Sequence, residues 1–444
     1  MGKQNRRTFV TRGAMVSALA LSPFVSRSRV RGANDRIILG LIGGRNRGKD
    51  IALASIRDGA EVKTFCDIDD GILADVGSEI AELQGKKPLY EKDFRRLLED
   101  PEIDAVLIGT PDHWHTYQVV AACEAGKDVY VEKPLCQTME EGRLLVDVAR
   151  RHKRVVQVGT QRRSGLHFAS AVSQVKSGIL GKVCLMKAWM CQVRPDIGNP
   201  PDGPVPSGVD YEMWLGPAPN RPFNPLRFHY NWRFFWDYGN SELGNQGIHL
   251  LDIALWAISE MKGLENNLPT RVSGQGGIYW LHDAKEVPDT QIVSYDYGDF
   301  TLVWELRSFQ DSHPIEGMHA GTAFYGTEGT LVLDHSGWKI YGSDGKVEKE
   351  EAASSGSPIM GRQGGSSHTK NFLDAMCSRI PPNADIEVGR RSTALCHLGN
   401  IAHRLGRDIR FDPKTETFGE DEEANAMLRK GYRAPWGLRQ LGRS

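Results

Sequence analysis

The chain has 444 residues, which is enough for two or three domains of ordinary size. With 40% hydrophobic and 25% charged residues, its composition is that of an ordinary globular protein. A formal net charge of -1, without a dense basic tract after residue 31, argues against a nucleic-acid partner.

The N-terminal segment resembles an export signal more than a part of the fold. Arg6 and Arg7 precede an uncharged apolar run over 13–25, which is too short to span a bilayer. This pattern indicates a secretory signal, and the adjacent arginines favour the twin-arginine route. We therefore expect residues 1–33 to be a signal segment and the mature protein to be periplasmic, without stable membrane insertion after export. An uncleaved anchor and a chance basic start are the alternatives, and the cleavage site (near Ala20 or near Ala33) is left open.

From residue 36 to residue 160, apolar strands alternate with amphipathic helices. The predicted strands are 36–43, 61–67, 104–111, 128–134 and 154–160, and the predicted helices are 50–58, 72–84, 115–125 and 139–152. Continuous apolar strands of this kind belong to a parallel sheet that is covered on both faces. We therefore predict a doubly wound α/β domain over 35–158, with ligands at the carboxyl ends of the strands.

After residue 160, loops rich in Gly and Pro appear, and strand-like segments over 290–297, 300–306 and 329–334 follow without long helices between them. This pattern predicts a second domain over 159–412, of α+β type with a large and mostly antiparallel sheet. Two late helices are expected within 361–379 and 389–406, and 413–444 is expected to be a tail that packs back on the fold. Seven scattered cysteines without Cys-x-x-Cys spacing argue against a zinc site and against a dense disulfide framework.

A glycine-rich loop follows the first strand and opens the first helix. Gly43 and Gly48 occupy the first and third places of the dinucleotide fingerprint, whereas Arg45 stands at the place of the middle glycine. A tight structural turn is the alternative explanation. Asp67 ends the second strand about 20 residues further on, where an acid accepts hydrogen bonds from the adenosine ribose. The predicted dinucleotide site therefore includes Gly43, Arg45, Asn46, Arg47, Gly48 and Asp67.

Acidic residues near the end of the second strand favour NAD over NADP. Asp69 and Asp70 add negative charge beside Asp67 and would repel a 2′-phosphate. Arg45 or Arg47 could instead contact phosphate groups, so NADP stays open.

The third predicted strand ends in the segment Thr-Pro-Asp-His-Trp-His. His113 and His115 lie two residues apart beside Asp112, which is not a standard spacing of metal ligands, so we predict no metal site. We interpret the segment as a loop that lies along the cofactor. Its predicted cofactor contacts are Thr110, Pro111, His113, Trp114 and His115.

The fourth predicted strand ends in a charge pair, Glu132 and Lys133, followed by Pro134. Burying a charge pair at the end of an apolar strand costs free energy, which indicates a functional reason for it. Pro134 restricts Lys133 to extended conformations, and Glu132 can supply a partner charge. The alternative is a solvated Glu-Lys pair at a strand end.

Together these motifs resemble the family of glucose-fructose oxidoreductase, inositol dehydrogenase and the rhizopine catabolism protein (Gfo/Idh/MocA). The motifs that carry the resemblance lie at 40–48, 66–69, 110–115, 131–134 and 244–252. The resemblance covers nearly the whole mature chain, and the segments 384–407 and 423–436 are similar to the exported, twin-arginine branch of the family. It implies an N-terminal Rossmann domain, a C-terminal open-faced sheet domain and a substrate between them.

The resemblance also implies the catalytic residues. Lys133, with Glu132 before it, would sit beside the nicotinamide and the reacting hydroxyl, and His249 matches the family's histidine. Asn245 takes the place of the family's aspartate, a departure that leaves less negative charge to raise the basicity of the histidine. The spacing places Asn245, His249 and Asp252 on one helical face. Alternatively, Asn245 caps the helix, His249 packs underneath it and Asp252 is structural.

Oxidation of a secondary alcohol requires hydride transfer to the nicotinamide and removal of the hydroxyl proton. A histidine titrates near neutrality, so His249 can take that proton. A lysine near the charged nicotinamide should have a lowered pKa, because of desolvation and like charge, so Lys133 can donate to or accept from the hydroxyl oxygen.

The segment 227–240 is crowded with aromatic residues. Trp232 and Trp236 could stack on sugar faces, and Arg233 could hydrogen-bond to hydroxyl groups. Gln161 and Arg162, just after the fifth strand, could reach the same pocket. An aromatic core or a subunit interface is the alternative. The resemblance and this mixture of aromatic and polar residues indicate a carbohydrate substrate.

We therefore predict an NAD(P)-dependent oxidoreductase that acts on a sugar or glycoside hydroxyl. Because free NAD is scarce outside the cytoplasm, the cofactor of an exported enzyme should be tightly bound and recycled. The alternative is an NAD-dependent glycoside hydrolase that works by transient oxidation, elimination and re-reduction. A third hypothesis, favoured by Asn245 in place of an acid, is a non-catalytic protein that binds a sugar and a dinucleotide. The family resemblance further implies a homo-oligomer, a dimer or a tetramer.

Overall fold

The N-terminal part is built on a six-stranded sheet in which every pairing is parallel. The computed structural model describes residues 36–353 and 366–438, so the predicted signal segment lies outside the described residues. The strands are β1 (Ile38–Ile42), β2 (Glu61–Cys66), β3 (Leu89–Glu91), β4 (Ala105–Ile108), β5 (Asp128–Val131) and β6 (Val156–Val158). Their spatial order is β3-β2-β1-β4-β5-β6, and the order reverses between β1 and β4. A ligand crevice is therefore expected at the carboxyl ends of these two strands.

Helices cover both faces of this sheet, which explains why β4 and β5 are buried along their whole length. The helices of this part are α1 (Arg47–Arg57), α2 (Asp70–Gln84), α3 (Phe94–Glu99), α4 (Asp112–Glu124) and α5 (Met139–Arg151). A later helix, α9 (Ser366–Ser378), returns to the same sheet, where Phe372 packs edge-on against Tyr130 of β5.

The C-terminal part is a nine-stranded sheet with the order β14-β13-β12-β11-β7-β10-β9-β8-β15. Its strands are β7 (Val183–Cys191), β8 (Arg271–Gly277), β9 (Thr290–Asp296), β10 (Thr301–Arg307), β11 (Ala320–Gly326), β12 (Gly329–Leu333), β13 (Gly337–Gly342), β14 (Val347–Ala352) and β15 (Ile409–Arg410). The pairing of β10 with β7 is parallel and the other pairings are antiparallel. The predicted fold class, a Rossmann sheet followed by a mostly antiparallel sheet, is confirmed.

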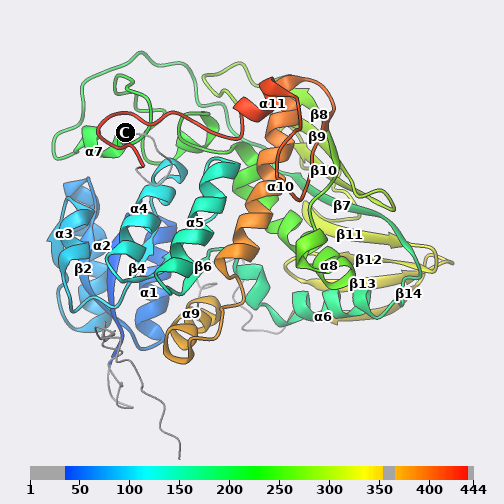
Figure 1. The fold of residues 1–444 in the computed structure, drawn as a ribbon, viewed down its shortest axis with the longest axis horizontal. Helices are drawn as coiled ribbons and strands as arrows, with labels where there is room; N and C mark the ends of the chain where they lie inside the picture. The colour runs from blue at the N-terminus through cyan, green and yellow to red at the C-terminus, as the bar shows by residue number, and fades with distance from the viewer. Residues whose placement is uncertain (1–35, 354–365, 439–444) are drawn as a thin grey trace, which may run out of the picture. The chain divides into compact units, whose positions relative to one another are not determined.

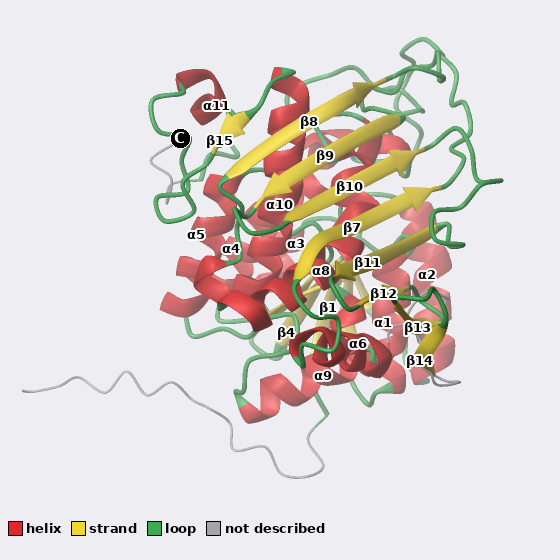
Figure 2. Cartoon of the chain, turned by 90° about the vertical axis from the view of Figure 1, so that its right-hand side faces the viewer, coloured by secondary structure: helices red, strands yellow, loops and turns green. Residues whose placement is uncertain are grey.

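The second sheet is covered on one face. Residues of β10 alternate between buried and half-buried, as a sheet with one packed face requires. The packed face lies against α6 (Leu166–Lys176), α8 (Ile248–Lys262) and α10 (Ile386–Leu405). In Figure 2 the strands β7, β8, β9 and β10 face the viewer with no helix in front of them.

Helix α10 joins the two parts. Figure 1 shows it standing between the parallel sheet and the antiparallel sheet. The carboxylate of Asp385 caps its N-terminus by accepting from the Glu387 N–H, and Gly406 ends it in the left-handed conformation. The buried guanidinium of Arg390 pairs with Glu416 at 2.7 Å, which ties α10 to the C-terminal tail.

Three helices begin three residues earlier than predicted. Helix α1 begins at Arg47 rather than at residue 50, α4 at Asp112 rather than at residue 115, and α10 at Ile386 rather than at residue 389. The residues after Pro111 are therefore helical and not a loop, because Pro111 takes the N-cap position and Asp112 follows in the first turn. The short elements β3 and α3, between β2 and β4, were not predicted.

Within the described residues, no helix combines the length and the apolar sequence that crossing a membrane would require. The seven cysteines all lie in this part of the chain and have free thiols.

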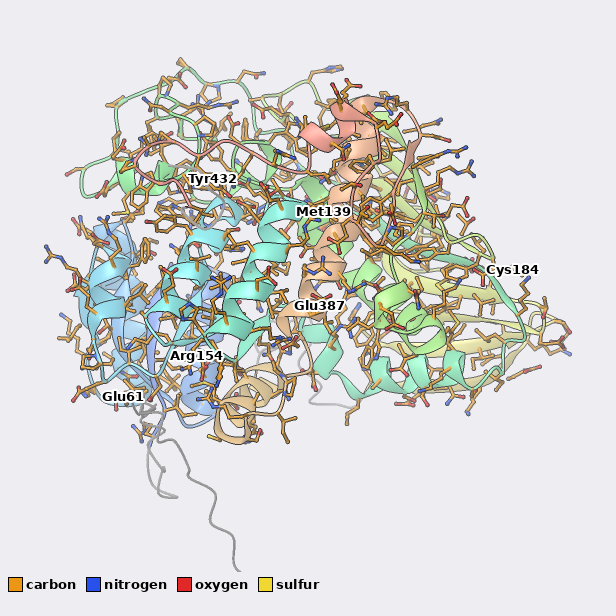
Figure 3. The ribbon with its side chains drawn as sticks, in the orientation of Figure 1. Glu61, Met139, Arg154, Cys184, Glu387 and Tyr432 are labelled. Carbon is orange, nitrogen blue, oxygen red and sulfur yellow. The ribbon has the colours of Figure 1, made fainter. Side chains whose placement is uncertain are left out.

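The tail after α11 (Glu422–Ala426) lies along the Rossmann part. Figure 3 labels Tyr432 in this tail, near the ends of α4 and α5, and its hydroxyl donates to the buried Glu141 carboxylate at 2.6 Å. Trp436 packs edge-on against Trp114 and Tyr117 of α4, with ring centroids 4.9 Å and 5.4 Å apart. The tail thus covers a helix whose first residues face the ligand crevice.

Replacing Trp436 with alanine should remove this cover. The side chain is 6% exposed, so we expect Trp436→Ala to lower the free energy of unfolding by about 3–5 kcal/mol. Trp280→Ala is the matched control, because Trp280 is 47% exposed and its loss should change stability by less than about 0.5 kcal/mol. Denaturant unfolding of the two variants measures the difference, and equal effects would mean that the tail does not stabilise the fold.

Candidate functional site

A cleft of about 1140 Å³ opens at the carboxyl ends of β1 and β4. It runs from the loop after β1 to the loop after β5, and the segment 229–245 closes one side. The predicted site residues that line it are Gly43, Arg45, Asn46, Arg47, Asp67, Thr110, Pro111, Trp114, Glu132, Lys133, Trp232, Arg233 and Asn245. The predicted site residues outside its lining are Gly48, His113, His115, Gln161, Arg162, Trp236, His249 and Asp252.

The loop between β1 and α1 has room for glycine alone at two places. Gly43 has a φ of +79°, and a Cβ on Gly48 would lie 1.8 Å from the Gly43 carbonyl oxygen. A Cβ on Gly109, after β4, would lie 2.6 Å from the Gly48 Cα, so α1 and β4 meet backbone to backbone. Asn46 is the N-cap residue of α1, but no side chain caps this end. An uncapped helix N-terminus in a cleft fits the pyrophosphate of a dinucleotide.

Asp67 follows β2 and braces this loop. Its Oδ2 accepts from the Gly44 N–H at 2.8 Å, and its Oδ1 accepts from the Asp69 N–H at 3.2 Å. Burial raises the pKa of Asp67 to about 6. The carboxylate lies in the wall of the cleft, and its contact with a ribose stays a prediction.

The neighbouring acids each have a basic partner. Asp69 Oδ2 lies 2.8 Å from His229 Nε2, and Asp70 pairs with Lys92 at 2.9 Å. Both partners line the cleft, but burial lowers the pKa of His229, so His229 is a neutral partner of Asp69. Lys92 therefore offsets part of the negative charge beside Asp67.

Lys133 follows β5 and reaches across to the second domain. Its Nζ donates to the backbone carbonyl of Asn245 at 2.6 Å and to the side-chain Oδ1 of Asn245 at 3.1 Å. The peptide bond between Lys133 and Pro134 is cis. Burial lowers the pKa of Lys133 to about 8; the charge of Arg233 lowers it further, while Glu132 opposes the shift. The ammonium proton is therefore easier to remove than that of an exposed lysine.

Glu242 and Arg194, on the side away from Lys133, set the orientation of the Asn245 amide. Its Nδ2 donates to Glu242 Oε2 at 3.2 Å, and Glu242 pairs with Arg194 at 2.8 Å. Because an ionised carboxylate can only accept hydrogen bonds, the amide nitrogen must face Glu242. The amide oxygen therefore faces Lys133.

The Glu132 carboxylate pairs with Arg47 and not with Lys133 Nζ. It lies 3.3 Å from Arg47 Nη2, at the start of α1, and is almost fully buried. A Cβ on Gly159 would lie 2.7 Å from Glu132 Oε1, so the glycine after β6 leaves the space that the carboxylate fills. The pair joins the glycine loop to the loop that carries Lys133.

Asn245, His249 and Asp252 have different surroundings. Asn245 lies in a π-helical turn, η3 (Leu243–Gly247), and Gly247 is the N-cap of α8. Asp252 is fully buried and accepts from Arg163 Nε at 2.9 Å and from the Ser392 hydroxyl. It therefore belongs to a structural ion pair and not to the cleft.

His249 lies beside the cleft, one helical turn after Asn245. Burial lowers its pKa well below the ordinary value, and the charges of Lys133 and Arg162 lower it further. Its Nδ1 is buried and has no hydrogen-bond partner among the described residues. The imidazole is therefore neutral at neutral pH and keeps one ring nitrogen available.

After β4, Thr110 and Trp114 of α4 line the cleft, while the two histidines in the first turn of α4 face the protein. His113 Nε2 bonds to the Trp214 carbonyl at 2.9 Å, and burial lowers the pKa of His113 to about 3. His115 lies between two carbonyls, with Nδ1 2.7 Å from Pro134 O and Nε2 3.0 Å from Thr110 O. His115 thus links the loops after β4 and β5 from behind. Across the described residues, no cluster of three or more His, Cys, Asp and Glu side chains is placed to hold a metal ion.

Among the predicted substrate residues, Trp232 and Arg233 line the cleft. Trp236 lines a separate cavity, where the guanidinium of Arg404 lies 5.0 Å from its ring centroid. Gln161 and Arg162 are buried in η1 (Gln161–Ser164), and burial lowers the pKa of Arg162 to about 10. The structure therefore groups Lys133, Asn245, Trp232 and Arg233, and leaves Trp236 outside.

Sequence reasoning missed several contributors to the site. Asp112 lines the cleft, accepts from Asn240 Nδ2 at 2.9 Å, and has its pKa raised by burial. Glu242 lies three residues before Asn245, a spacing that could have indicated a contact on one helical turn. Arg194 lies in a Pro-rich loop without any local signal, and its pairing with Glu242 depends on tertiary structure.

Comparisons with known proteins agree with this architecture. A family model described as an oxidoreductase family with an NAD-binding Rossmann fold matches residues 37–160. A second, described as the C-terminal alpha/beta domain of the oxidoreductase family, matches residues 189–301 and 343–438. A solved levoglucosan dehydrogenase, in complex with NADH and levoglucosan, has a TM-score of 0.63 at 18% identity, over 85% of this chain and 99% of that one.

Curated relatives are similar over shorter stretches. Levoglucosan dehydrogenase of Pseudarthrobacter phenanthrenivorans is 26% identical over 281 residues, which is 60% of this chain and 64% of that protein. A glycosyl hydrolase family 109 protein of Shewanella pealeana is 30% identical over 155 residues, or 34% of each chain. The chain thus matches less than two thirds of the length of these relatives. The two family models together span most of the chain, and the protein belongs to the Gfo/Idh/MocA oxidoreductase family, with an NAD-binding Rossmann domain.

Proposed function

We propose that the protein is an NAD-dependent oxidoreductase that oxidises a secondary hydroxyl group of a sugar or glycoside. The observation that carries the proposal is the buried amine of Lys133, which lies in the same cleft as the glycine loop and has a lowered pKa. The similarity to levoglucosan dehydrogenase supports a sugar as the substrate class.

The residues of this chain divide the work as follows. When NAD is bound in the cleft, its nicotinamide ring supplies the hydride acceptor. The neutral amine of Lys133 takes the hydroxyl proton, and the two oxygens of Asn245 then stabilise the ammonium that results. Arg47 and Glu132 hold the loops after β1 and β5 together, so the amine and the cofactor site keep a fixed separation.

We assign His249 a hydrogen-bonding role rather than the role of proton acceptor expected from the sequence. An imidazole whose pKa lies well below its ordinary value is a weak base at neutral pH. Its buried, unpartnered Nδ1 and its place one turn after Asn245 support a hydrogen bond to a buried water beside the cleft.

We further propose that the protein is exported by a twin-arginine signal with its cofactor already bound. Arg6 and Arg7, followed by the apolar run over 13–25, support export. We also propose a homo-oligomer, because the sheet face seen in Figure 2 has no cover from residues 36–353 and 366–438 and carries the half-exposed Ile292.

A second candidate function is that of an NAD-dependent glycoside hydrolase. The similarity to a glycosyl hydrolase family 109 protein favours it, although that similarity covers 34% of either chain. In this reaction the sugar would be oxidised, would lose its aglycone by elimination, would add water and would be reduced again, so the cofactor would end unchanged.

Protein isolated from the periplasm, without added NAD, distinguishes the candidates. We expect mass spectrometry to find NAD or NADH in the denatured protein. We also expect one sugar equivalent per site to be oxidised, with a rise in reduced-nicotinamide absorbance. Catalytic release of the aglycone from an aryl glycoside, without net reduction, would instead identify the hydrolase. A trapped nucleotide whose absorbance changes with no sugar or glycoside would contradict both.

The rate of oxidation should depend on the protonation of Lys133. Since the amine must be neutral to accept a proton, kcat/KM should rise with pH through an apparent pKa of about 8. Lys133→Met should lower kcat by about 10²–10⁴ and remove this dependence. Lys127→Met is the control, because burial also lowers the pKa of Lys127 but this residue lies outside the cleft. A pH profile that survives in Lys133→Met would exclude Lys133 as the base.

Restoring the family's aspartate at position 245 should harm this protein. In Asn245→Asp, a carboxylate would replace the amide that now donates to Glu242 at 3.2 Å, so two carboxylates would repel each other. We expect lower activity and a lower melting temperature. Adding Glu242→Gln should recover most of both, with a coupling energy of about 1 kcal/mol or more between the two sites. Higher activity of the single variant would show that Glu242 does not orient residue 245.

A further inference from the structure

We propose that the substrate is an acidic sugar and that Arg233 binds its carboxylate. The proposal rests on the proposed function and narrows its substrate class. Arg233 and Lys133 line the same cleft, and the charge of Arg233 is close enough to lower the pKa of Lys133. The cleft therefore holds a second cation, Arg233, near the lysine that handles the proton.

The guanidinium of Arg233 is held in one orientation. Its Nε donates to the Tyr230 carbonyl at 2.9 Å, and its Cζ lies 4.1 Å from the Tyr230 ring centroid and 5.0 Å from the Trp232 ring centroid. Its backbone packs closely against Gly239, where a Cβ would lie 2.5 Å from the Arg233 Cα. An orientation fixed in this way is suited to recognition of a planar group.

The terminal nitrogens of Arg233 have no partner. Within the described residues, neither Nη1 nor Nη2 makes a hydrogen bond, and no carboxylate lies within 4.0 Å. Desolvation by burial lowers the pKa of the guanidinium, as expected for a cation without a counter-charge. An anionic ligand with two oxygens would supply both hydrogen bonds and charge.

The acidic side chains near Arg233 already pair with other residues. Glu242 pairs with Arg194, and Glu132 pairs with Arg47. Asp112 accepts from Asn240 Nδ2, and burial raises its pKa, which weakens its hold on a negative charge. The groups facing Arg233 from the packed elements are thus Glu242, Asp112, Arg194, Tyr230 and Lys133. The two carboxylates balance Arg194 and Lys133, so the charge of Arg233 itself remains in excess, and an oxidised nicotinamide would add to it.

The cofactor phosphates do not account for Arg233. The glycine loop and the uncapped end of α1 are the built phosphate site, and the residues there are Gly43, Asn46 and Gly48. Arg233 comes from η2 (Asn231–Phe234), in the aromatic segment, and lies near Lys133 and Asp112. The geometry therefore directs its fork toward the substrate. A carboxylate matches a planar fork through two parallel hydrogen bonds, so a uronic acid or its glycoside is the expected class.

Calorimetry on the NADH-loaded protein tests the proposal without turnover, because the reduced cofactor cannot accept hydride from the probes. The probes are methyl glucuronide, methyl galacturonide, their neutral methyl esters and glucose 6-sulfate. We expect each uronide to bind at least about tenfold more tightly than its ester. Arg233→Gln should abolish this preference and Arg233→Lys should restore it in part, because lysine keeps the charge but loses the fork. NAD affinity should not change in either variant.

Arg227→Gln is the matched control. Arg227 lies in the same segment but pairs with Asp202 at 3.0 Å outside the cleft, so its loss should leave the preference intact. Equal binding of acid and ester by the native protein would overturn the proposal, as would a preference for the sulfate ester or a loss of NAD affinity in Arg233→Gln. Uronide binding without oxidation at any pH would sustain this inference and contradict the proposed oxidoreductase instead.

Discussion

The site depends on keeping one amine buried without a carboxylate against it. Lys133 Nζ is satisfied by two oxygens of Asn245, both of which are neutral, so its charge is compensated only through the more distant carboxylates of Glu132 and Asp112. A carboxylate at the same distance would favour the ammonium and raise its pKa. The neutral partner lets burial dominate, and the pKa falls to about 8. The neutral Asn245 therefore helps to keep the pKa of Lys133 at about 8. At this pKa the amine can lose its proton near neutral pH and is still basic enough to accept one from the substrate.

Holding that arrangement requires contributions from both parts of the fold. Lys133 comes from the parallel sheet, and Asn245 comes from the turn before α8, which packs on the antiparallel sheet. Helix α10 fixes the two against each other. Thr393 of α10 accepts from the Leu135 N–H at 3.1 Å, just after Lys133, and Asn400 donates to the Asn240 carbonyl at 3.0 Å. One helix thus positions the loops on both sides of the cleft, and its Arg390 reaches the tail.

The sequence was sufficient where local pattern and function coincide. Apolar runs that end in Gly, Asp or Lys predicted the parallel strands, because a strand buried on both faces must be continuous and its polar end must lie at the ligand edge. Gly43 and Gly48 were identifiable because their backbone positions exclude any side chain. His113 and His115 misled, because a buried histidine that bonds to carbonyls looks in sequence like one that faces a ligand.

The sequence was insufficient where the backbone leaves the regular α-helix and where partners come from distant segments. Leu243–Gly247 form a π-helical turn before α8, which the prediction of one helical face for Asn245, His249 and Asp252 did not include. No residue type within Leu243–Gly247 predicts a π-helical turn. The partners Arg194 and Arg163 come from distant segments, so neither ion pair could be found from spacing.

The family's aspartate is replaced by Asn245 in this chain, and the nearby negative charge lies on another residue. A carboxylate is present at Glu242, three residues earlier, but its charge is matched by Arg194 and its lone pairs hold the Asn245 amide. Glu242 therefore orients the Asn245 side chain, while the charge of Arg194 offsets the charge of Glu242 near Lys133. Among the described residues, neither Lys133 nor Arg233 has a carboxylate in direct contact, and the free energy of desolvating two cations is partly recovered only when a negatively charged ligand enters. Selectivity for the ligand and basicity of the lysine then have the same origin, because the anion that Arg233 binds would reduce the positive potential around the amine.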